Sequence, residues 1–148
     1  MSGKRWFVDT SVFLAIVTGQ SRAARRWFNE SQEAGDGFAA AMMLDVEVWR
    51  WVRRRRVRGL AAPSSAELDD ALARLHRVPL SDAIATTAIA LDEPLRGADA
   101  LHIASALTLG TRVVTLVTHD AEMALAATSL GFLGFDPVTD DPQGSPVF

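Results

Sequence analysis

Short apolar runs alternate with longer amphipathic segments along most of this chain, and this alternation constrains the fold more than any other feature. The runs RWFVD and RVVTLVT, at residues 5–9 and 112–118, are rich in β-branched or aromatic residues and are typical of buried strands. Weaker strand candidates lie around Phe38, at 78–80 and at 131–135. Strands separated by helices form right-handed crossovers, which predicts a parallel sheet covered by helices on both faces.

Seven segments between these strand candidates have the apolar spacing of amphipathic helices. They are residues 11–18, 21–34, 43–58, 65–76, 82–91, 97–109 and 120–130. Ser64 and Glu67 form a capping box that predicts where the fourth of these helices begins. The predicted fold class is therefore α/β, with three layers in the order α/β/α.

The composition is that of one globular domain. The chain has 148 residues, of which 49% are hydrophobic and 22% charged. No apolar stretch approaches the ~20 residues of a membrane span, and the start MSGKRW leads directly into the first strand, without the pattern of a signal peptide. There are no cysteines, which excludes disulfides and thiolate metal sites. We expect a cytoplasmic protein with a folded domain at 1–135 and a polar, Pro-rich tail at 136–148.

Acidic residues recur where the predicted helices begin. Asp9 directly follows the first strand, and Asp120 follows the strand near residue 117. Asp99 opens the helix at 97–109, while Asp45 and Glu47 both lie on the helix after the second strand. A single acid at such a place is most simply a helix cap. Because the carboxyl ends of parallel strands form the ligand crevice of an open sheet, the recurrence predicts an acidic site there.

Clustered carboxylates raise one another's pKa values unless a cation neutralises them. The natural partner is a hard divalent ion, Mg²⁺ or Mn²⁺, which prefers oxygen ligands. Zinc is disfavoured because His76, His102 and His119 do not have the spacing of a zinc site. We expect His102, which has apolar neighbours, to be a packing or helix-face residue.

Arginine dominates the basic residues of a chain whose net charge is −3. Fourteen of the fifteen basic residues are Arg, and six of them lie in RWVRRRRVRG at 50–59. Such a run is either a solvated helix face or a phosphate-binding surface. Three of these arginines share a helical stripe with Glu47: Arg50, Arg54 and Arg58. An acidic metal site beside this stripe favours phosphodiester chemistry, with the stripe binding the RNA backbone.

Four segments, in this order, resemble the PIN-domain ribonucleases and most closely the VapC toxins of bacterial toxin–antitoxin pairs: FVDTSVFLA, VEVWRWVRR, LRGADALHIASAL and VVTLVTHDAEMALAATSLGF. The resemblance covers about residues 5–135 and implies a parallel sheet of about five strands. It also implies a set of metal-binding and catalytic acids, namely Asp9, Glu47, Asp99 and Asp120. Ser11 and Thr118 would be their polar neighbours.

The family resemblance implies a Mg²⁺- or Mn²⁺-dependent endoribonuclease that cleaves tRNA or ribosomal RNA and so arrests growth. It further implies a homodimer and a small VapB-like antitoxin whose C-terminal segment blocks the acidic groove. Periodicity alone does not distinguish Asp45 from Glu47 as the second acid; the resemblance and the arginine stripe favour Glu47, which leaves Asp45 to interact with the helix dipole. Ala41 and Leu44 stand where family members often carry Ser or Thr.

Three other classes of protein were compared with the same residues. A response-regulator receiver needs a lysine near its last strand, whereas Lys4 is the only lysine in the chain. A haloacid-dehalogenase-like phosphatase needs a second Asp where Ser11 stands. A PIN domain that binds RNA or a protein without cutting remains the alternative to a nuclease.

Overall fold

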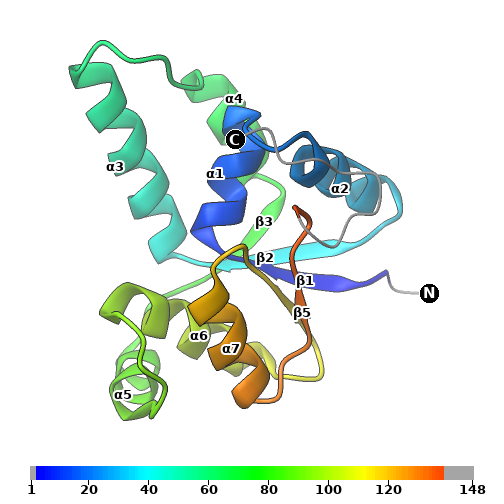
Figure 1. Cartoon of the computed structure of the whole chain (residues 1–148), viewed down its shortest axis with the longest axis vertical. Helices are drawn as coiled ribbons and strands as arrows, with labels where there is room; N and C mark the ends of the chain where they lie inside the picture. The colour runs from blue at the N-terminus through cyan, green and yellow to red at the C-terminus, as the bar shows by residue number, and fades with distance from the viewer. Residues whose placement is uncertain (1–2, 139–148) are drawn as a thin grey trace.

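The computed structural model describes residues 3–138, which form a five-stranded sheet with helices on both faces (Figure 1). All strand pairs are parallel, and the strand order is β3-β2-β1-β4-β5. The strands are β1 Arg5–Val8, β2 Gly37–Ala41, β3 Leu75–Val78, β4 Thr115–Val117 and β5 Gly134–Phe135. The predicted α/β class with a parallel sheet of about five strands is confirmed.

Seven helices in the described part of the chain make the two outer layers. They are α1 Thr10–Thr18, α2 Arg22–Glu33, α3 Met43–Val57, α4 Ser65–Leu72, α5 Asp82–Ala90, α6 Gly97–Leu109 and α7 Ala121–Ser129. In Figure 1, α1 to α4 lie above the sheet and α5 to α7 below it. Two apolar cores follow from this arrangement, because successive residues of a strand point to opposite faces.

Strand β1 shows how the two cores arise from one short sequence. Trp6 and Val8 belong to the core under α1 to α4, and Phe7 between them belongs to the core under α5 to α7. A strand covered on both faces must be apolar at every position, which explains the continuous run WFV.

The winding of the sheet reverses between β1 and β4. The chain runs outward from β1 through β2 to β3 and then returns to place β4 on the other side of β1. Val8 pairs with Val117, and the Asp9 amide donates to the Val117 carbonyl at 3.0 Å. The carboxyl ends of β1 and β4 therefore form the switch point at which such sheets bind ligands.

The predicted boundary between the fourth helix and the third strand is wrong. Helix α4 ends at Leu72 rather than at residue 76, and β3 begins at Leu75 rather than at 78. Residues 75–78 pair with β2 along its length, from Phe38 with Leu75 to Ala41 with Val78. These non-local hydrogen bonds outweigh the local helical periodicity.

The folded body extends beyond residue 135. Val138 is 2% exposed and belongs to the core under α1 to α4. The beginning of the expected polar tail thus packs against the domain, and residues 139–148 of that tail lie outside the described residues. No helix within residues 3–138 combines the length and apolar character that crossing a membrane requires.

Candidate active site

Asp9 lies at the switch point, directly after β1, and is only 6% exposed. It occupies the N-cap position of α1, yet its carboxylate accepts no capping hydrogen bond from a backbone amide of that helix. Instead, its Oδ2 accepts from the hydroxyls of Ser11 at 3.0 Å and Thr118 at 2.7 Å. The expected polar neighbours therefore hold the Asp9 carboxylate in place, and the simple capping role does not account for it.

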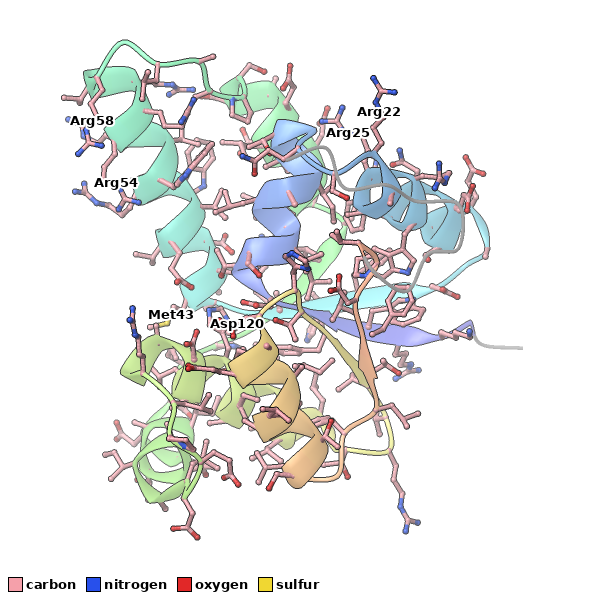
Figure 2. All side chains as sticks on the ribbon, in the orientation of Figure 1. Arg22, Arg25, Met43, Arg54, Arg58 and Asp120 are labelled. Atoms are coloured by element: carbon pink, nitrogen blue, oxygen red, sulfur yellow. The ribbon has the colours of Figure 1, made fainter. Side chains whose placement is uncertain are left out.

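Asp120 begins α7 at the end of the neighbouring strand β4 (Figure 2). Its Oδ1 caps the helix by accepting from the amides of Glu122 at 2.8 Å and Met123 at 3.2 Å. Its own amide donates to the Thr118 hydroxyl at 3.1 Å. Thr118 therefore connects Asp120 with Asp9 across the two central strands.

Glu47 reaches this region from α3, on the opposite layer from α6. Its Oε1 accepts from the Thr10 hydroxyl at 2.9 Å and from His102 Nε2 at 2.5 Å. Thr10 and His102 are also in contact, with 3.2 Å between Oγ1 and Nε2. His102 is almost completely buried, so a network of three side chains joins α1, α3 and α6.

Within this network, Glu47 and protonated His102 form an ion pair. Burial alone would raise the pKa of Glu47, but hydrogen bonds from His102 and Thr10 and the charge of His102 outweigh it, so the pKa lies below its ordinary value. Burial would likewise lower the pKa of His102, and the hydrogen bond to Glu47 and the nearby carboxylates raise it instead. Charge on Glu47 and a proton on His102 therefore stabilise one another.

Asp99 lies in the first turn of α6, and its pKa depends on the charges of the other three acids. Burial is the largest cause that raises its pKa above the ordinary 3.8. The negative charges of Asp9, Asp120 and Glu47 raise the pKa further, and His102 opposes them. The four acids expected from the sequence therefore act on one another electrostatically.

Asp45 lies outside this group. It is in the first turn of α3, and its Oδ1 is 3.7 Å from Arg77 Nε. Of the two acids that periodicity could not separate, the fold thus brings Glu47 to the other carboxylates and pairs Asp45 with β3.

Comparisons with known proteins identify the family. Residues 6–128, which include all four acids, match the PIN domain family. The chain is a PIN-domain protein. It is also 31% identical over 129 residues to Ribonuclease VapC35 of Mycobacterium tuberculosis, covering 84% of this chain and 90% of that relative. The resemblance to VapC-type PIN domains is thereby confirmed.

Solved structures show the same fold at lower identity. The chain aligns with a crystal structure of VapBC2 from Rickettsia felis bound to a promoter DNA fragment, with a TM-score of 0.67 and 13% identity over 89% of this chain and 98% of that chain. It also aligns with PAE2754 from Pyrobaculum aerophilum, with a TM-score of 0.60 and 17% identity over 90% and 92% of the two chains. At these identities the matches concern the PIN fold alone.

The four acids of this PIN domain offer carboxylate oxygens, which are the ligands that a hard divalent ion prefers. Within residues 3–138 no three acidic or histidine side chains converge closely enough to ligate an ion as they stand. However, several carboxylate oxygens at the site have no hydrogen-bond partner among the described residues: Asp9 Oδ1, Glu47 Oε2, Asp120 Oδ2 and both oxygens of Asp99. Unpaired oxygens together with the raised pKa of Asp99 fit Mg²⁺ or Mn²⁺.

The arginines of α3 divide into two groups. Arg55 donates to the Ala61 carbonyl at 2.5 Å and Arg56 to the Pro63 carbonyl at 3.3 Å, so both hold the connection to α4. The stripe of Arg50, Arg54 and Arg58 is exposed, and the side chains of these three residues make no hydrogen bond or ion pair with residues 3–138. Figure 2 shows Arg54 and Arg58 directed away from the rest of the molecule.

Two residues of the network were not expected at the site. His102 was interpreted as a packing or helix-face residue; it is buried, as packing predicts, but it also bonds Glu47 and Thr10, which was not predicted. A signal existed: His102 lies three residues after Asp99, so both face the same side of α6. Thr10 offered no separate signal beyond its place beside Asp9.

Proposed function

We propose that this protein is the toxin of a VapBC-type pair, a divalent-metal-dependent endoribonuclease that cleaves tRNA or ribosomal RNA and arrests growth. One observation carries the proposal. At the switch point of a VapC-type PIN domain, burial and the negative charges of Asp9, Asp120 and Glu47 raise the pKa of Asp99, and each of these four carboxylates keeps at least one oxygen without a partner among the described residues.

The protein's own contribution is to fix the carboxylates. Ser11 and Thr118 hold one oxygen of Asp9, the amides at the start of α7 hold one oxygen of Asp120, and Thr10 and His102 hold one oxygen of Glu47. In each case the second oxygen remains available. Asp9, Glu47, Asp99 and Asp120 would together hold Mg²⁺ or Mn²⁺, which supplies an activated water and stabilises charge on the phosphate.

The exposed arginine stripe on α3 is the proposed contact with RNA. Guanidinium groups suit bidentate phosphate binding, and the stripe starts one turn beyond Glu47. Arg58 lies roughly 16 Å along the helix from Glu47, so the stripe would extend over several nucleotides.

The family supports proposals for the partner, the oligomeric state and the cellular location of this protein. The Rickettsia structure is a VapBC complex, and this supports a VapB-like antitoxin as the partner of this chain. We propose a homodimer that acts in the cytoplasm, where its RNA substrates are.

The direct test is cleavage of purified tRNA and ribosomal RNA. The protein should cut with Mg²⁺ or Mn²⁺ and should not cut in EDTA. Asp99→Asn should reduce cleavage by at least about a hundredfold and abolish growth arrest on induction, because removal of a catalytic group typically costs that much. Asp92→Asn, at an exposed acid on the same layer, is the matched control.

Asp99→Asn protein that remains as toxic as the wild type would contradict the nuclease proposal. The same assay separates the alternative of a non-cleaving PIN domain, which would bind RNA without producing cleavage products in either metal.

A further inference from the structure

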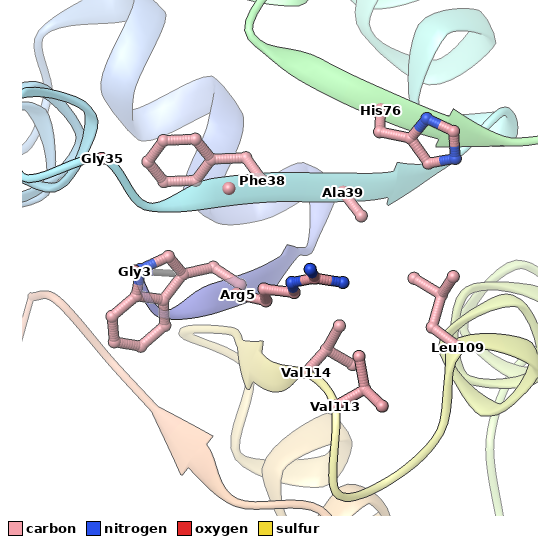
Figure 3. Close-up of a pocket in the computed structure, with 11 residues that line it drawn as sticks. Gly3, Arg5, Gly35, Phe38, Ala39, His76, Leu109, Val113 and Val114 are labelled. Carbon is pink, nitrogen blue, oxygen red and sulfur yellow. The ribbon is translucent and has the colours of Figure 1, made fainter. Parts of the chain in front are cut away.

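A cavity of about 400 Å³ opens at the amino ends of the strands, at the opposite end of the sheet from the acids (Figure 3). Its floor is formed by Arg5 of β1, Gly37 and Ala39 of β2 and His76 of β3. This volume is within the ~300–1,000 Å³ of typical small-molecule sites.

The register of the sheet explains the floor. Arg5 pairs with Gly37 and Ala39 pairs with His76, so these residues of three neighbouring strands share one face. The two small residues therefore lie between Arg5 and His76, which are two strand spacings of about 4.8 Å apart across the sheet and two residues apart along the strand direction.

Within residues 3–138, the small residues Gly37 and Ala39 leave space over this part of the sheet. Helix α6, which packs on the same face, ends at Leu109, and the chain then forms a wall with Val113 and Val114. A Cβ added at Gly37 would meet no atom within 4 Å. Figure 3 shows Arg5 extending across the space between Ala39 and the valine wall.

The charge of the cavity is unmatched. The side chain of Arg5 makes no hydrogen bond or ion pair with any residue in 3–138, and none of the residues in that range that line the cavity is acidic. Asp36 is nearby, but its oxygens are taken by the Lys4 amide at 2.9 Å and the Trp6 indole at 2.8 Å. An unpaired guanidinium beside apolar walls favours a ligand that combines an anion with an apolar body.

We propose that this cavity binds a small amphipathic carboxylate. Its carboxylate accepts hydrogen bonds from Arg5, with His76 as a second donor, and its apolar body lies over Gly37 and Ala39 against Val113. The site is independent of the nuclease proposal, because it uses other residues at the other end of the sheet.

The test is an NMR titration of the full chain with 3-phenylpropionate and, as the uncharged counterpart, 3-phenylpropionamide. The carboxylate should shift the amides of Gly37, Ala39 and Val113 in a saturable way. The amide should bind at least about tenfold more weakly, because it lacks the charge that Arg5 recognises.

Three variants locate the site. Arg5→Gln should weaken binding of the carboxylate at least about tenfold, whereas Lys4→Gln, at the adjacent cation outside the cavity, should leave it unchanged. Gly37→Val should abolish binding by filling the floor, and valine suits a strand position with open space. Asp99→Asn should bind the carboxylate like the wild type.

Equal binding of carboxylate and amide, or unchanged affinity in Arg5→Gln, would overturn the proposal. So would the absence of saturable shifts up to about 10 mM ligand, an affinity too weak for a specific site. If Gly37→Val fails to fold, as judged by circular dichroism, the Arg5 and Lys4 variants decide the question alone.

Discussion

The two ends of the central sheet carry opposite chemistry, although the same strands form both. At the carboxyl ends, three of the four acids accept hydrogen bonds from hydroxyl, amide or imidazole donors, namely Asp9, Asp120 and Glu47. At the amino ends, an unpaired Arg5 lies beside apolar walls. The difference follows from parallel topology, because β2, β3 and β4 are each preceded by the end of a helix and followed by the start of the next one.

Helix dipoles match this division. Asp9, Asp99 and Asp120 lie at or just inside the N-termini of α1, α6 and α7, where partial positive charge favours carboxylates. At the other end of the sheet, α6 ends at Leu109, which lines the cavity that holds Arg5. The pKa of Asp99 is nevertheless raised, first by burial and then by the negative charges of the neighbouring acids.

The largest expected effect is a loss of Mn²⁺ affinity, which tests whether only the site at the carboxyl ends of the strands binds metal. Glu47→Gln should lower Mn²⁺ affinity by at least about tenfold, because a neutral amide loses the charge that attracts the ion. Asp45→Asn, which affects only the pair with Arg77, should keep Mn²⁺ affinity within about twofold. Isothermal titration calorimetry measures both.

Arg5→Gln serves as the control from the other end of the sheet and should bind Mn²⁺ like the wild type. Loss of Mn²⁺ binding in Asp45→Asn with retention in Glu47→Gln would reverse the assignment of the second acid.

A smaller effect is expected at His102, which acts on the metal site only through Glu47. His102→Ala should reduce Mn²⁺ affinity roughly tenfold, because residues that orient metal ligands typically contribute 10–100-fold. His102→Gln, which keeps an N–H near the place of Nε2, should restore much of the affinity. Calorimetry combined with thermal melting separates this positioning role from a loss of folding.

Ser105→Ala is the matched control, since Ser105 is buried on α6 and donates only to the Leu101 carbonyl of its own helix. Equal losses of Mn²⁺ affinity in the Ser105 and His102 variants would contradict a specific role for His102.

The sequence predicted well those features of the fold that depend on neighbouring residues, and less well those that depend on the pairing of distant strands. Apolar runs, helical periodicity and the Ser64 cap, which accepts from the Glu67 amide at 3.1 Å, predicted most elements close to their bounds. The end of α4 was wrong because the pairing of β3 with β2 determines it. The neighbourhood of β1 and β4 depends on the strand order, which no local pattern carries; the family resemblance implied a parallel sheet of about five strands without giving their order.

The candidate site shows the same division between local and non-local information. Asp9, Asp99 and Asp120 were found from their positions after strands and at helix starts, and the structure brings them together with Glu47. Their catalytic roles stay predictions. Helical periodicity could not separate Asp45 from Glu47, because both flank the buried stripe at similar angles. Glu47 and His102 are 55 residues apart in the sequence, and the periodicity of a single helix cannot predict a contact between two helices.

A third prediction concerns the surface between the acids and solvent. Replacing Arg54 and Arg58 with Ala should weaken RNA binding and reduce the slope of log K against log salt by about 1.5, as expected for two lost phosphate contacts. The matched control is the pair Arg22→Ala and Arg112→Ala, at exposed arginines on other elements. Filter binding at several salt concentrations measures the slope, and an unchanged slope would make the run a solvated helix face.

The smallest effect is a pH dependence of stability that only the carboxyl end should show. The raised pKa of Asp99 means that, between the ordinary 3.8 and the raised value, the folded state binds more protons than the unfolded state. The free energy of unfolding of the metal-free protein should therefore fall as pH rises through this window. Asp99→Asn should remove that fall, and Arg5→Gln should keep it, since Arg5 lies at the other end of the sheet. Urea unfolding across the window measures the difference, and identical pH profiles for wild type and Asp99→Asn would contradict a raised pKa of Asp99 in the folded state.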